Sequence, residues 1–239
     1  MTATVRIEGT WPGPVSLRRG WARAEARPWN DVIPMAQLRL VRTAGPGFIG
    51  DCVGALLEAG TEGVLSPPLP RSAQRSWRDA GFTPHTGLAL MRRRLDSVPP
   101  PGHLVVVGGS DDIAEVLRID AAAFSSFWRF DAAALTESMN ATSVSVLLVV
   151  RGPESGLSGF AVAGMGSRLA YLQRVAVDPR QQRTGMGRSL VRAAARWAAR
   201  QGAGTIMLNT MHDNPAAMHL YEAEGFDTLD EPLEVLRSA

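Results

Sequence analysis

Two closely spaced glycines stand at the start of a long amphipathic pattern, in the segment Gln182-Arg183-Thr184-Gly185-Met186-Gly187-Arg188. A glycine removes the Cβ atom where a ligand must approach the backbone, and it permits unusual backbone angles. The start of a helix adds unpaired N–H groups and the positive end of the helix dipole, which together suit a pyrophosphate. The glycines match neither a dinucleotide fingerprint nor the Gly-Lys-Ser/Thr of a P-loop. We predict a backbone phosphate site here, although the glycines alone would also fit a loop that binds nothing.

The elements around this loop are predicted from apolar periodicity and from the residues that end helices and strands. Tyr171 to Val177 is predicted to be a strand that breaks at Asp178-Pro179, just before the loop. The helix after the loop has an apolar stripe at three- and four-residue spacing: Met186, Leu190, Ala193, Ala194 and Trp197. Gly202 ends this helix, and Thr205 to Asn209 is predicted to be the next strand.

The same helix carries a basic stripe at strict four-residue spacing, formed by Arg188, Arg192, Arg196 and Arg200. Only Arg188 lies close enough to the loop to help hold a phosphate. The other three arginines are predicted to form a solvated basic face.

This order of features resembles the GNAT superfamily of N-acetyltransferases. The resemblance rests on the loop Gln182-x-x-Gly185-x-Gly187 together with Asn214 and Tyr221 downstream. It implies an α/β fold (α+β mixed sheet), acetyl-CoA as the co-substrate and no metal. The cofactor-binding residues that it implies are Val175, Ala176, Val177, Gln182, Arg183, Thr184, Gly185, Met186, Gly187, Arg188 and Asn214. The first three would pair through their backbone with the pantetheine arm, and the N–H groups of Arg183 to Arg188 would hold the pyrophosphate.

Tyr221 is the one catalytic residue that the resemblance implies. It matches the family's tyrosine, which protonates the departing thiolate, and a phenol with an unperturbed pKa near ~10 is a reasonable acid for that step. Its structural alternative is packing beside Leu220 and Phe226. Asn214 matches the asparagine whose side chain reaches the cofactor, but it is also a good helix N-cap before Pro215, and both readings stay open.

Within the superfamily, segments 172–179 and 208–226 look most like the ribosomal-protein alanine N-acetyltransferases. Those enzymes often carry a glutamate base five residues before the asparagine, where this chain has Asn209. Asparagine cannot take a proton at neutral pH, so the base cannot be carried over. An α-amine of pKa near ~7.7–8.0 is roughly a tenth neutral at pH 7, whereas a lysine near ~10.4 is almost entirely charged. The site therefore favours weakly basic acceptors, and His212 with Asp213 could relay a proton through water.

We expect an acetyl-CoA-dependent N-acetyltransferase that transfers directly to an amine, preferably the α-amine of a protein or peptide N-terminus. A small-molecule amine is the second expectation, because the same residues would support it. Tandem mycothiol-forming acetyltransferases are also similar, although their first domain is less truncated. A non-catalytic acyl-CoA sensor or interaction module is the alternative from another class; Asn209 favours it, and Tyr221 with an intact loop opposes it.

The domain organisation is predicted from a break with three prolines. A linker is expected over residues 98–102, between an N-terminal domain (1–97) and a catalytic domain (103–239). In the catalytic domain we expect further elements at residues 103–107 (strand), 111–124 (helix), 144–150 (strand) and 159–164 (strand). The aromatic segment Phe124 to Phe130 is either a lip of the acceptor site or an anchor of the core.

The N-terminal half resembles a degenerate, partial acetyltransferase domain. Trp77 stands four residues before Gly81-Phe82, as Tyr221 stands four before Gly225-Phe226. Tryptophan offers no acid of suitable pKa, and the shortened glycine loop at residues 44–47 lacks the Gln-x-x-Gly-x-Gly pattern. We expect a structural partner without catalysis.

The composition excludes several other classes. The chain of 239 residues is 45% hydrophobic and 20% charged, with a net charge of only +2, so direct nucleic-acid binding is not indicated. No apolar run suits a membrane span or a signal segment. Cys52 is the single cysteine, which fits a reducing compartment, so the cytoplasm is the expected location. The histidines show no metal spacing, and nothing indicates the oligomeric state.

Overall fold

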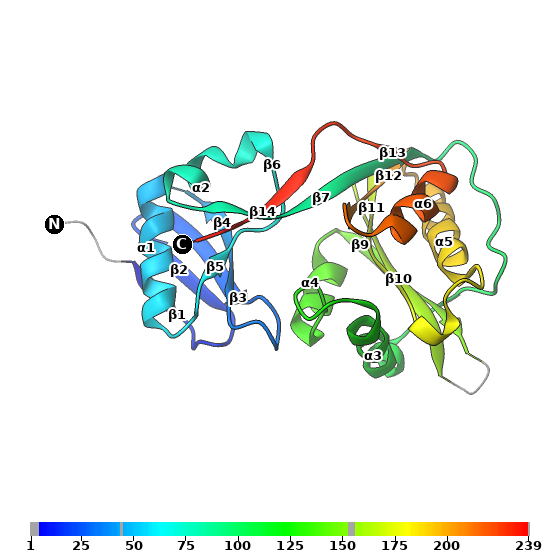
Figure 1. Ribbon diagram of the computed structural model, residues 1–239, viewed down its shortest axis with the longest axis horizontal. Coiled ribbons are helices and arrows are strands. Elements are labelled where there is room, and N and C mark those ends of the chain that lie inside the picture. Colours follow the sequence, from blue (N-terminus) through cyan, green and yellow to red (C-terminus); the bar gives the residue numbers. More distant parts are fainter. Residues whose placement is uncertain (1–4, 44, 153–155, 239) are drawn as a thin grey trace. The chain divides into compact units, whose positions relative to one another are not determined.

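The protein is described by a computed structural model of residues 5–43, 45–152 and 156–238, which form two compact units (Figure 1). The first unit comprises residues up to Leu88 together with those from Glu231 onward, and the second comprises Ala89–Asp230. This division differs from the ranges 1–97 and 103–239 expected from the sequence. The reason is that strand β7 (Thr83–Arg94) runs across the boundary, and strand β14 (Leu233–Arg237) returns to the first unit to pair with the first half of β7.

The second unit is built on a mixed sheet in the order β7-β12-β11-β10-β9-β8, with β13 beside β7. Its strands from β8 to β11 are antiparallel, whereas β11 and β12 run parallel. The strands are β8 (Val106–Val107), β9 (Val144–Arg151), β10 (Leu157–Gly166), β11 (Leu169–Val177), β12 (Thr205–Met211) and β13 (Asp227–Thr228). The expectation of a mixed α/β sheet is confirmed.

Helices cover both faces of this sheet, as Figure 1 shows. They are α3 (Ile113–Ala123), α4 (Ala132–Asn140), α5 (Met186–Arg200) and α6 (Pro215–Ala223). Alternation along β10 separates two cores: Ala161 and Ala163 pack toward α5, whereas Phe160 and Val162 pack with α3 and α4. The small residues facing α5 let that helix lie close, and it buries Leu190, Val191, Ala194 and Ala198 completely.

One sequence prediction in this unit needs correction, and one helix was missed. The strand predicted from His103 begins only at Val106, because the N–H groups of Gly102 and His103 bond to the side chain of Ser189 on α5 instead of to a neighbouring strand. Helix α4 was not predicted at all; Asp131 caps it by accepting a hydrogen bond from the N–H of Ala134 at 2.7 Å.

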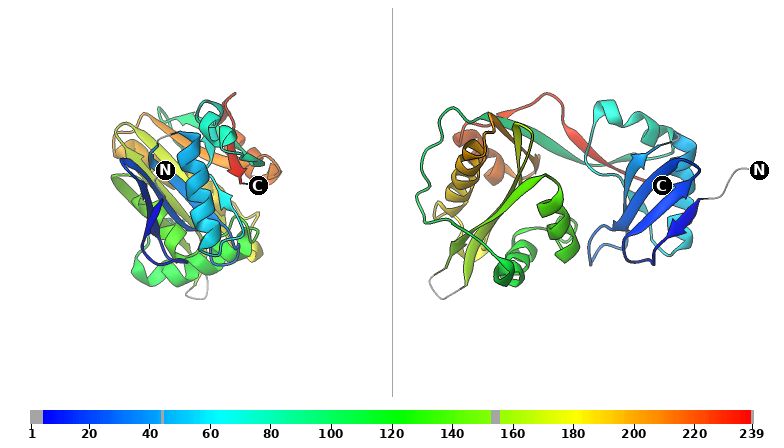
Figure 2. Two further views of the ribbon diagram at one scale, coloured as in Figure 1. Left: turned by 90° about the vertical axis from the view of Figure 1, so that its left-hand side faces the viewer. Right: turned by 180° about the vertical axis from the view of Figure 1, so that it is seen from behind.

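The first unit repeats part of the second in its connections. Its sheet runs β1-β2-β3-β4-β5-β14-β7, and α1 packs across one face of it (Figure 2). The elements are β1 (Arg6–Glu8), β2 (Val15–Arg19), β3 (Ala22–Pro28), β4 (Ala36–Arg42), α1 (Pro46–Glu58), β5 (Val64–Leu65), β6 (Leu69–Pro70) and α2 (Arg75–Asp79). Three antiparallel strands lead through a helix to a parallel strand, as β9-β10-β11-α5-β12 do.

The repeat extends to an aromatic pair in each unit. Trp77 contacts Phe82 edge to face with ring centres 4.9 Å apart, and Tyr221 contacts Phe226 in the same way at 5.7 Å. In each pair the phenylalanine N–H donates to the carbonyl of the earlier aromatic residue, at 3.1 and 3.0 Å. The glycine between them is left-handed in both cases (φ 89° and 77°). The degenerate repeat read from the sequence is therefore present in the fold.

Candidate acyl-CoA site

A split between two parallel strands forms the centre of the candidate site. Strand β11 pairs with β12 only from Leu169 to Tyr171, but it pairs with β10 as far as Val177. Within the described part of the chain, the backbone of Val175 to Val177 thus has a strand on one side only. An extended ligand can add to such an unpaired edge as an extra strand would. The predicted pantetheine-binding residues Val175, Ala176 and Val177 lie along this edge.

A β-bulge lies where the two strands separate. The register of β10 with β11 shifts between Val162 and Ala163, which leaves Gln173 as the extra residue. As a result Leu172 packs toward α5, while Arg174 reaches Asp120 on α3, on the opposite face. Bulges re-aim side chains and are common beside active sites. This bulge was not predicted from the sequence.

Gln173 points from the bulge across β10. A Cβ atom on Gly164 would stand 2.7 Å from Nε2 of Gln173 and 2.1 Å from Oγ1 of Thr142, so a larger residue there would have to displace these side chains. This nitrogen is buried and has no hydrogen-bond partner among the described residues. A buried amide without a partner costs free energy unless a ligand supplies the missing acceptor.

The predicted phosphate loop follows β11 directly. A 3₁₀ turn (Pro179–Gln181) comes first, and Arg183 and Gly185 then take left-handed angles, with φ of 66° and 88°. No side chain caps α5, and its first internal bond runs from the N–H of Ser189 to the carbonyl of Gly185 at 3.0 Å. The N–H groups of Met186, Gly187 and Arg188 therefore stand at the open end of the helix, which is the geometry that binds anions.

The side chains of the loop fix its shape. Gln182 donates to the carbonyl of Val177 at 3.4 Å, and Thr184 donates to the carbonyl of Gln181 at 2.7 Å. A Cβ atom on Gly187 would stand 3.4 Å from Leu220 and 3.7 Å from Val177. The end of β11, the start of α5 and helix α6 therefore meet at Gly187, where the backbone is close to both neighbours.

Asp178 anchors the turn that precedes the loop. Its buried carboxylate accepts hydrogen bonds from the backbone and guanidinium of Arg180 and from Arg118 of α3 at 3.0 Å. These bonds, those from the Arg180 side chain first, lower the pKa of Asp178 below its ordinary value. The carboxylate therefore stays ionised at neutral pH and holds the strand-to-loop corner.

Tyr221 lies on α6 and is buried beside Phe226. Burial raises the pKa of Tyr221 to about 12, and the positive charge of Arg174 works in the opposite direction. The phenol is thus protonated at neutral pH, as a proton donor must be. Both sequence readings of this residue are compatible with its position in the core.

Asn214 caps α6. Its Oδ1 accepts a hydrogen bond from the N–H of Ala217 at 3.1 Å, and Pro215 occupies the first helical position. The capping role is therefore present, and the contact of its side chain with a cofactor stays a prediction. Asn209 is exposed on β12, and His212 and Asp213 are exposed in the turn that follows.

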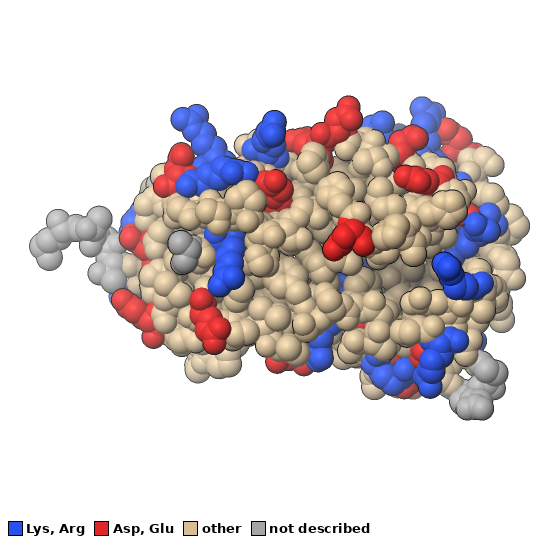
Figure 3. Space-filling model, in the orientation of Figure 1, with Lys and Arg blue, Asp and Glu red and all other residues tan. Residues whose placement is uncertain are grey.

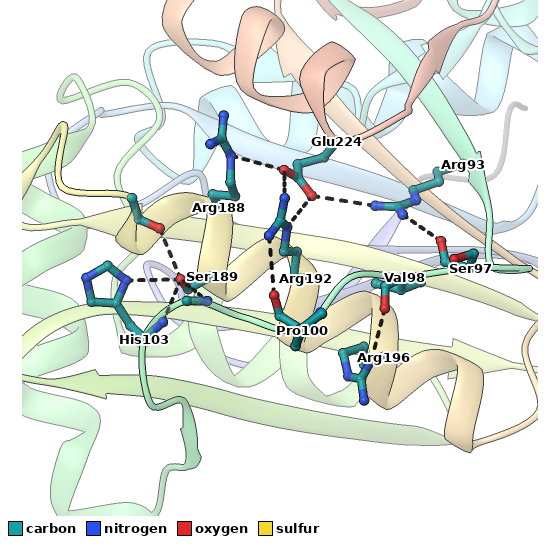
Figure 4. A network of polar contacts seen from close by, with 12 residues as sticks. Arg93, Ser97, Val98, Pro100, His103, Arg188, Ser189, Arg192, Arg196 and Glu224 are labelled. Carbon is teal, nitrogen blue, oxygen red and sulfur yellow. Dashed lines mark hydrogen bonds and ion pairs between the residues drawn. The ribbon is translucent and has the colours of Figure 1, made fainter.

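The basic stripe of α5 is only partly solvated, which corrects the sequence prediction. Figure 4 shows Arg188 and Arg192 converging on Glu224, at the end of α6, with Nε–carboxylate distances of 3.1 and 2.8 Å. Arg196 donates to the carbonyl of Val98 at 2.9 Å. Because the Glu224 side chain is only 2% exposed, the stripe binds a buried carboxylate that sequence reasoning missed.

The aromatic segment surrounds Arg174. The guanidinium lies 3.4 Å from the ring centre of Phe124 and 3.9 Å from that of Phe130, and it bonds to both oxygens of the fully buried Asp120. Its Nη2 also donates to the carbonyl of Trp128 at 2.7 Å. Phe124 and Phe130 are therefore anchors of the fold, and a lip role for Phe127 and Trp128 stays a prediction.

Two negative observations apply to the described residues. They contain no group of three or more His, Cys, Asp or Glu placed to hold a metal ion, and no helix among them is long and apolar enough to cross a membrane. On the face drawn in Figure 3, arginines and acidic residues are interspersed without a continuous field of one sign.

The split between β11 and β12, the glycine loop and the start of α5 lie in one continuous part of the chain. Residues 113–226 match the Acetyltransferase (GNAT) family, so this chain contains a GNAT acetyltransferase domain. A solved tandem GNAT protein from the clavulanic acid biosynthesis pathway has a similar fold, with a TM-score of 0.66 and 13% identity over 94% of this chain and 82% of that chain.

Among curated proteins, the similarity is to two kinds of acetyltransferase. A mycothiol acetyltransferase of Rhodococcus erythropolis is 31% identical over 59% of this chain and 54% of its own length, about half of the relative. The mycothiol acetyltransferase of Rhodococcus opacus is 29% identical over 85% of this chain and 75% of its own length. The ribosomal-protein bS18 alanine N-acetyltransferase of Escherichia coli is 35% identical, but over only 30% of this chain and 48% of its own length.

Proposed function

We propose that this chain is an acetyl-CoA-dependent N-acetyltransferase that transfers the acetyl group directly to an amine. The observation that carries the proposal is the unpaired edge of β11 from Val175 to Val177, which runs into the open N-terminus of α5. An extended arm ending in a pyrophosphate fits such an edge and such a helix start. Gly185, left-handed at φ 88°, supports the proposal, because the loop backbone takes an angle there that favours glycine.

The residues divide the work of a direct transfer between them. Backbone N–H groups of β11 near the bulge would polarise the thioester carbonyl, which the nitrogen of the acceptor attacks. As the carbon–sulfur bond breaks, Tyr221 would give its proton to the sulfur. The attacking amine loses a proton to solvent, and Tyr221 regains one. The raised pKa of Tyr221, about 12, keeps the donor loaded at neutral pH.

The proposed acceptor is a small molecule with a weakly basic amine. Position 209 carries an exposed asparagine, so no carboxylate stands there to deprotonate a strongly basic amine. The similarity to mycothiol acetyltransferases reaches 85% of this chain, whereas the similarity to the alanine N-acetyltransferase reaches 30%. The longer match supports a small-molecule acceptor, which we therefore propose in preference to the protein N-terminus expected first from the sequence.

The bulge supplies a contact for such an acceptor. Gln173 presents its unpartnered amide on the face of α3 and α4, opposite the helix that carries the phosphate loop. A carbonyl or hydroxyl oxygen beside the reacting amine would satisfy it. Replacing Gln173 by leucine would then raise the acceptor KM and leave the acetyl-CoA KM unchanged.

The first test is thiol release from acetyl-CoA with matched acceptors. The panel contains an amino sugar, an amino-acid amide, an alanine-starting peptide with an internal lysine, and that peptide with its N-terminus blocked. The chain contains no lysine. Thiol release in a reaction without any added acceptor therefore cannot come from acetylation of the enzyme's own lysine side chains. Release with the small amines supports the proposal, and release with the free peptide alone would establish the protein α-amine acceptor.

A non-catalytic acyl-CoA sensor is the competing function, and the exposed Asn209 favours it. Calorimetric binding of acetyl-CoA without thiol release from any of the four acceptors would support the sensor. An absence of binding would contradict both functions.

A further inference from the structure

The proline-rich segment 97–103, here named the strap, is fastened along α5. Arg93 donates to the carbonyl of Ser97 at 2.9 Å, Arg196 to that of Val98 at 2.9 Å, and Arg192 to that of Pro100 at 3.3 Å (Figure 4). The three consecutive prolines of the strap have no N–H to donate and favour an extended backbone, so arginines from outside satisfy its carbonyls. The strap therefore ends at a fixed point beside the first turn of α5.

Ser189 fixes that end and determines the tautomer of His103. Its Oγ accepts hydrogen bonds from the N–H groups of Gly102 and His103, at 3.2 and 3.1 Å. A hydroxyl oxygen has two lone pairs, and these two bonds occupy both. The O–H of Ser189 has two acceptors 3.1 Å away, the carbonyl of Gly185 and the ring nitrogen Nδ1 of His103. A proton on Nδ1 would find no free lone pair on this oxygen, so the neutral histidine carries its proton on Nε2.

The ring of His103 faces the phosphate loop. Its Cε1 lies 3.6 Å from the position that a Cβ atom on Gly185 would occupy, and Nε2 is bonded to Cε1. Among the described residues, Nε2 has no hydrogen-bond partner, and the side chain is half-buried. An N–H donor therefore stands next to Gly185, the residue that precedes α5.

We propose that the Nε2–H of His103 binds a phosphate oxygen of coenzyme A, alongside the N–H groups of Met186, Gly187 and Arg188. The inference rests on the proposed function and adds to it a side-chain contact from the strap, outside the loop itself. The contact is with an anion, because the unpaired N–H groups at this end of α5 donate and the helix dipole is positive there. Coenzyme A carries a pyrophosphate and a 3′-phosphate, and either could supply the oxygen.

The test is calorimetry of coenzyme A with the full chain and three substitutions at one position. In His103→Gln the side-chain nitrogen reaches roughly where Nε2 stood, but the Nδ1 acceptor is lost. In His103→Asn the oxygen replaces Nδ1 toward Ser189, but no donor reaches the phosphate. His103→Ala loses both, and His85→Ala in the first unit is the matched control.

The alanine and asparagine variants should bind coenzyme A about tenfold more weakly, the loss of one hydrogen bond to a charged group, while the glutamine variant stays within about threefold of the unsubstituted protein. Dephospho-coenzyme A, which lacks the 3′-phosphate, identifies the phosphate that His103 contacts. If His103→Ala still binds dephospho-coenzyme A about tenfold more weakly than the unsubstituted protein does, the contact is with the pyrophosphate. If the two proteins bind dephospho-coenzyme A equally well, the contact is with the 3′-phosphate. Thermal unfolding of each variant checks that it is folded.

Two results would overturn the inference while leaving the proposed function intact. One is unchanged affinity in His103→Ala; the other is full affinity in His103→Asn with a loss in His103→Gln, which would mean that His103 only anchors the strap to Ser189. Failure of the unsubstituted protein to bind coenzyme A would instead reject the proposed function, and this inference with it.

Discussion

Arg192 of α5 donates two hydrogen bonds to the carboxylate of Glu224, at 2.8 and 3.0 Å, and so joins the phosphate-loop helix to the helix that carries Tyr221. Arg188 and Arg93 add ion pairs to the same carboxylate, at 3.1 and 3.8 Å. Glu224 is three residues beyond Tyr221, so it fixes the end of that helix. The relative position of the two helices therefore depends on one buried acid.

Replacing Glu224 by glutamine should destabilise the protein by about 3 kcal/mol, because it leaves three guanidinium groups around an uncharged amide. The free energy of unfolding in urea measures this. Glu222→Gln, at an exposed position of the same helix, is the control and should change stability by less than about 0.5 kcal/mol. Equal stability of the two variants would show that the arginines are satisfied by solvent.

Tyr221→Phe should lower kcat roughly 10²- to 10⁴-fold, the usual contribution of a general acid, with little change in the KM for acetyl-CoA. The phenylalanine keeps the contact with Phe226, so the fold should persist. Because the pKa of Tyr221 is raised to about 12, the acid stays protonated and the rate of the unsubstituted enzyme should not fall between pH 8 and about pH 10. A pH–rate profile of the two proteins checks both statements, and near-normal turnover of the variant would assign Tyr221 to packing alone.

Arg174→Lys should destabilise the protein by about 3 kcal/mol, although the charge is kept. An ammonium group cannot bond to both oxygens of Asp120, reach the carbonyl of Trp128 and stack between two phenylalanine rings at once. Urea unfolding is the measurement, and Arg200→Lys at an exposed site of α5 is the control. A loss no larger than the control's would mean that charge alone holds Asp120.

Trp128→Ala separates the two readings of the aromatic segment. Trp128 contacts Phe127 edge to face at 5.0 Å, and its carbonyl, which the substitution keeps, holds Arg174. If the segment lines the acceptor site, the KM of the acceptor should rise severalfold while the acetyl-CoA KM stays constant. A change in stability with an unchanged acceptor KM would assign Trp128 to the core.

The corner at Asp178 predicts an acid-dependent stability. The pKa of Asp178 is lower in the folded protein than in the unfolded chain, where it is near ~3.9. The carboxylate therefore contributes its full stabilisation of the folded state above that unfolded pKa, and the stabilisation is lost as the pH falls through the folded pKa. Asp178→Asn should therefore cost about 2 kcal/mol at pH 7, and the difference from the unsubstituted protein should shrink as the pH is lowered below 4. Unfolding in urea at pH 7 and pH 3 measures it. A difference that does not depend on pH would contradict the assignment.

The sequence predicted the strand–loop–helix order around the site because each part has a local cause. The glycines at 185 and 187, the stop at Asp178-Pro179 and the apolar spacing of α5 all act within a few residues, and α5 begins at Met186, the first residue of the predicted apolar stripe. The fold class followed from the same order. Local patterns of this kind can be read without any knowledge of neighbours in space.

What the sequence did not predict depends on distant partners. Glu224 meets Arg192 across 32 positions, Arg174 meets Asp120 across 54, and Ser189 meets His103 across 86. The bulge at Gln173 depends on the pairing register of β11 with β10, and no residue type in β11 predicts that register. The three strands between Arg6 and Pro28 were not predicted because their apolar signal is weak: β1 and β2 are short, with three and five residues, and the inward residues of β3 are small alanines.

The route of β7 and β14 sets the order in which the chain can fold during synthesis. The first half of β7 has β14 as a sheet neighbour, and the residues of β14 leave the ribosome after all of Ala89–Asp230. The N-terminal unit therefore cannot complete its sheet until the acetyltransferase unit has been synthesised, and until then the edge of β7 that β14 will cover stays unpaired. A fragment that stops before Glu231 would keep that edge exposed, and exposed edges are where chains aggregate.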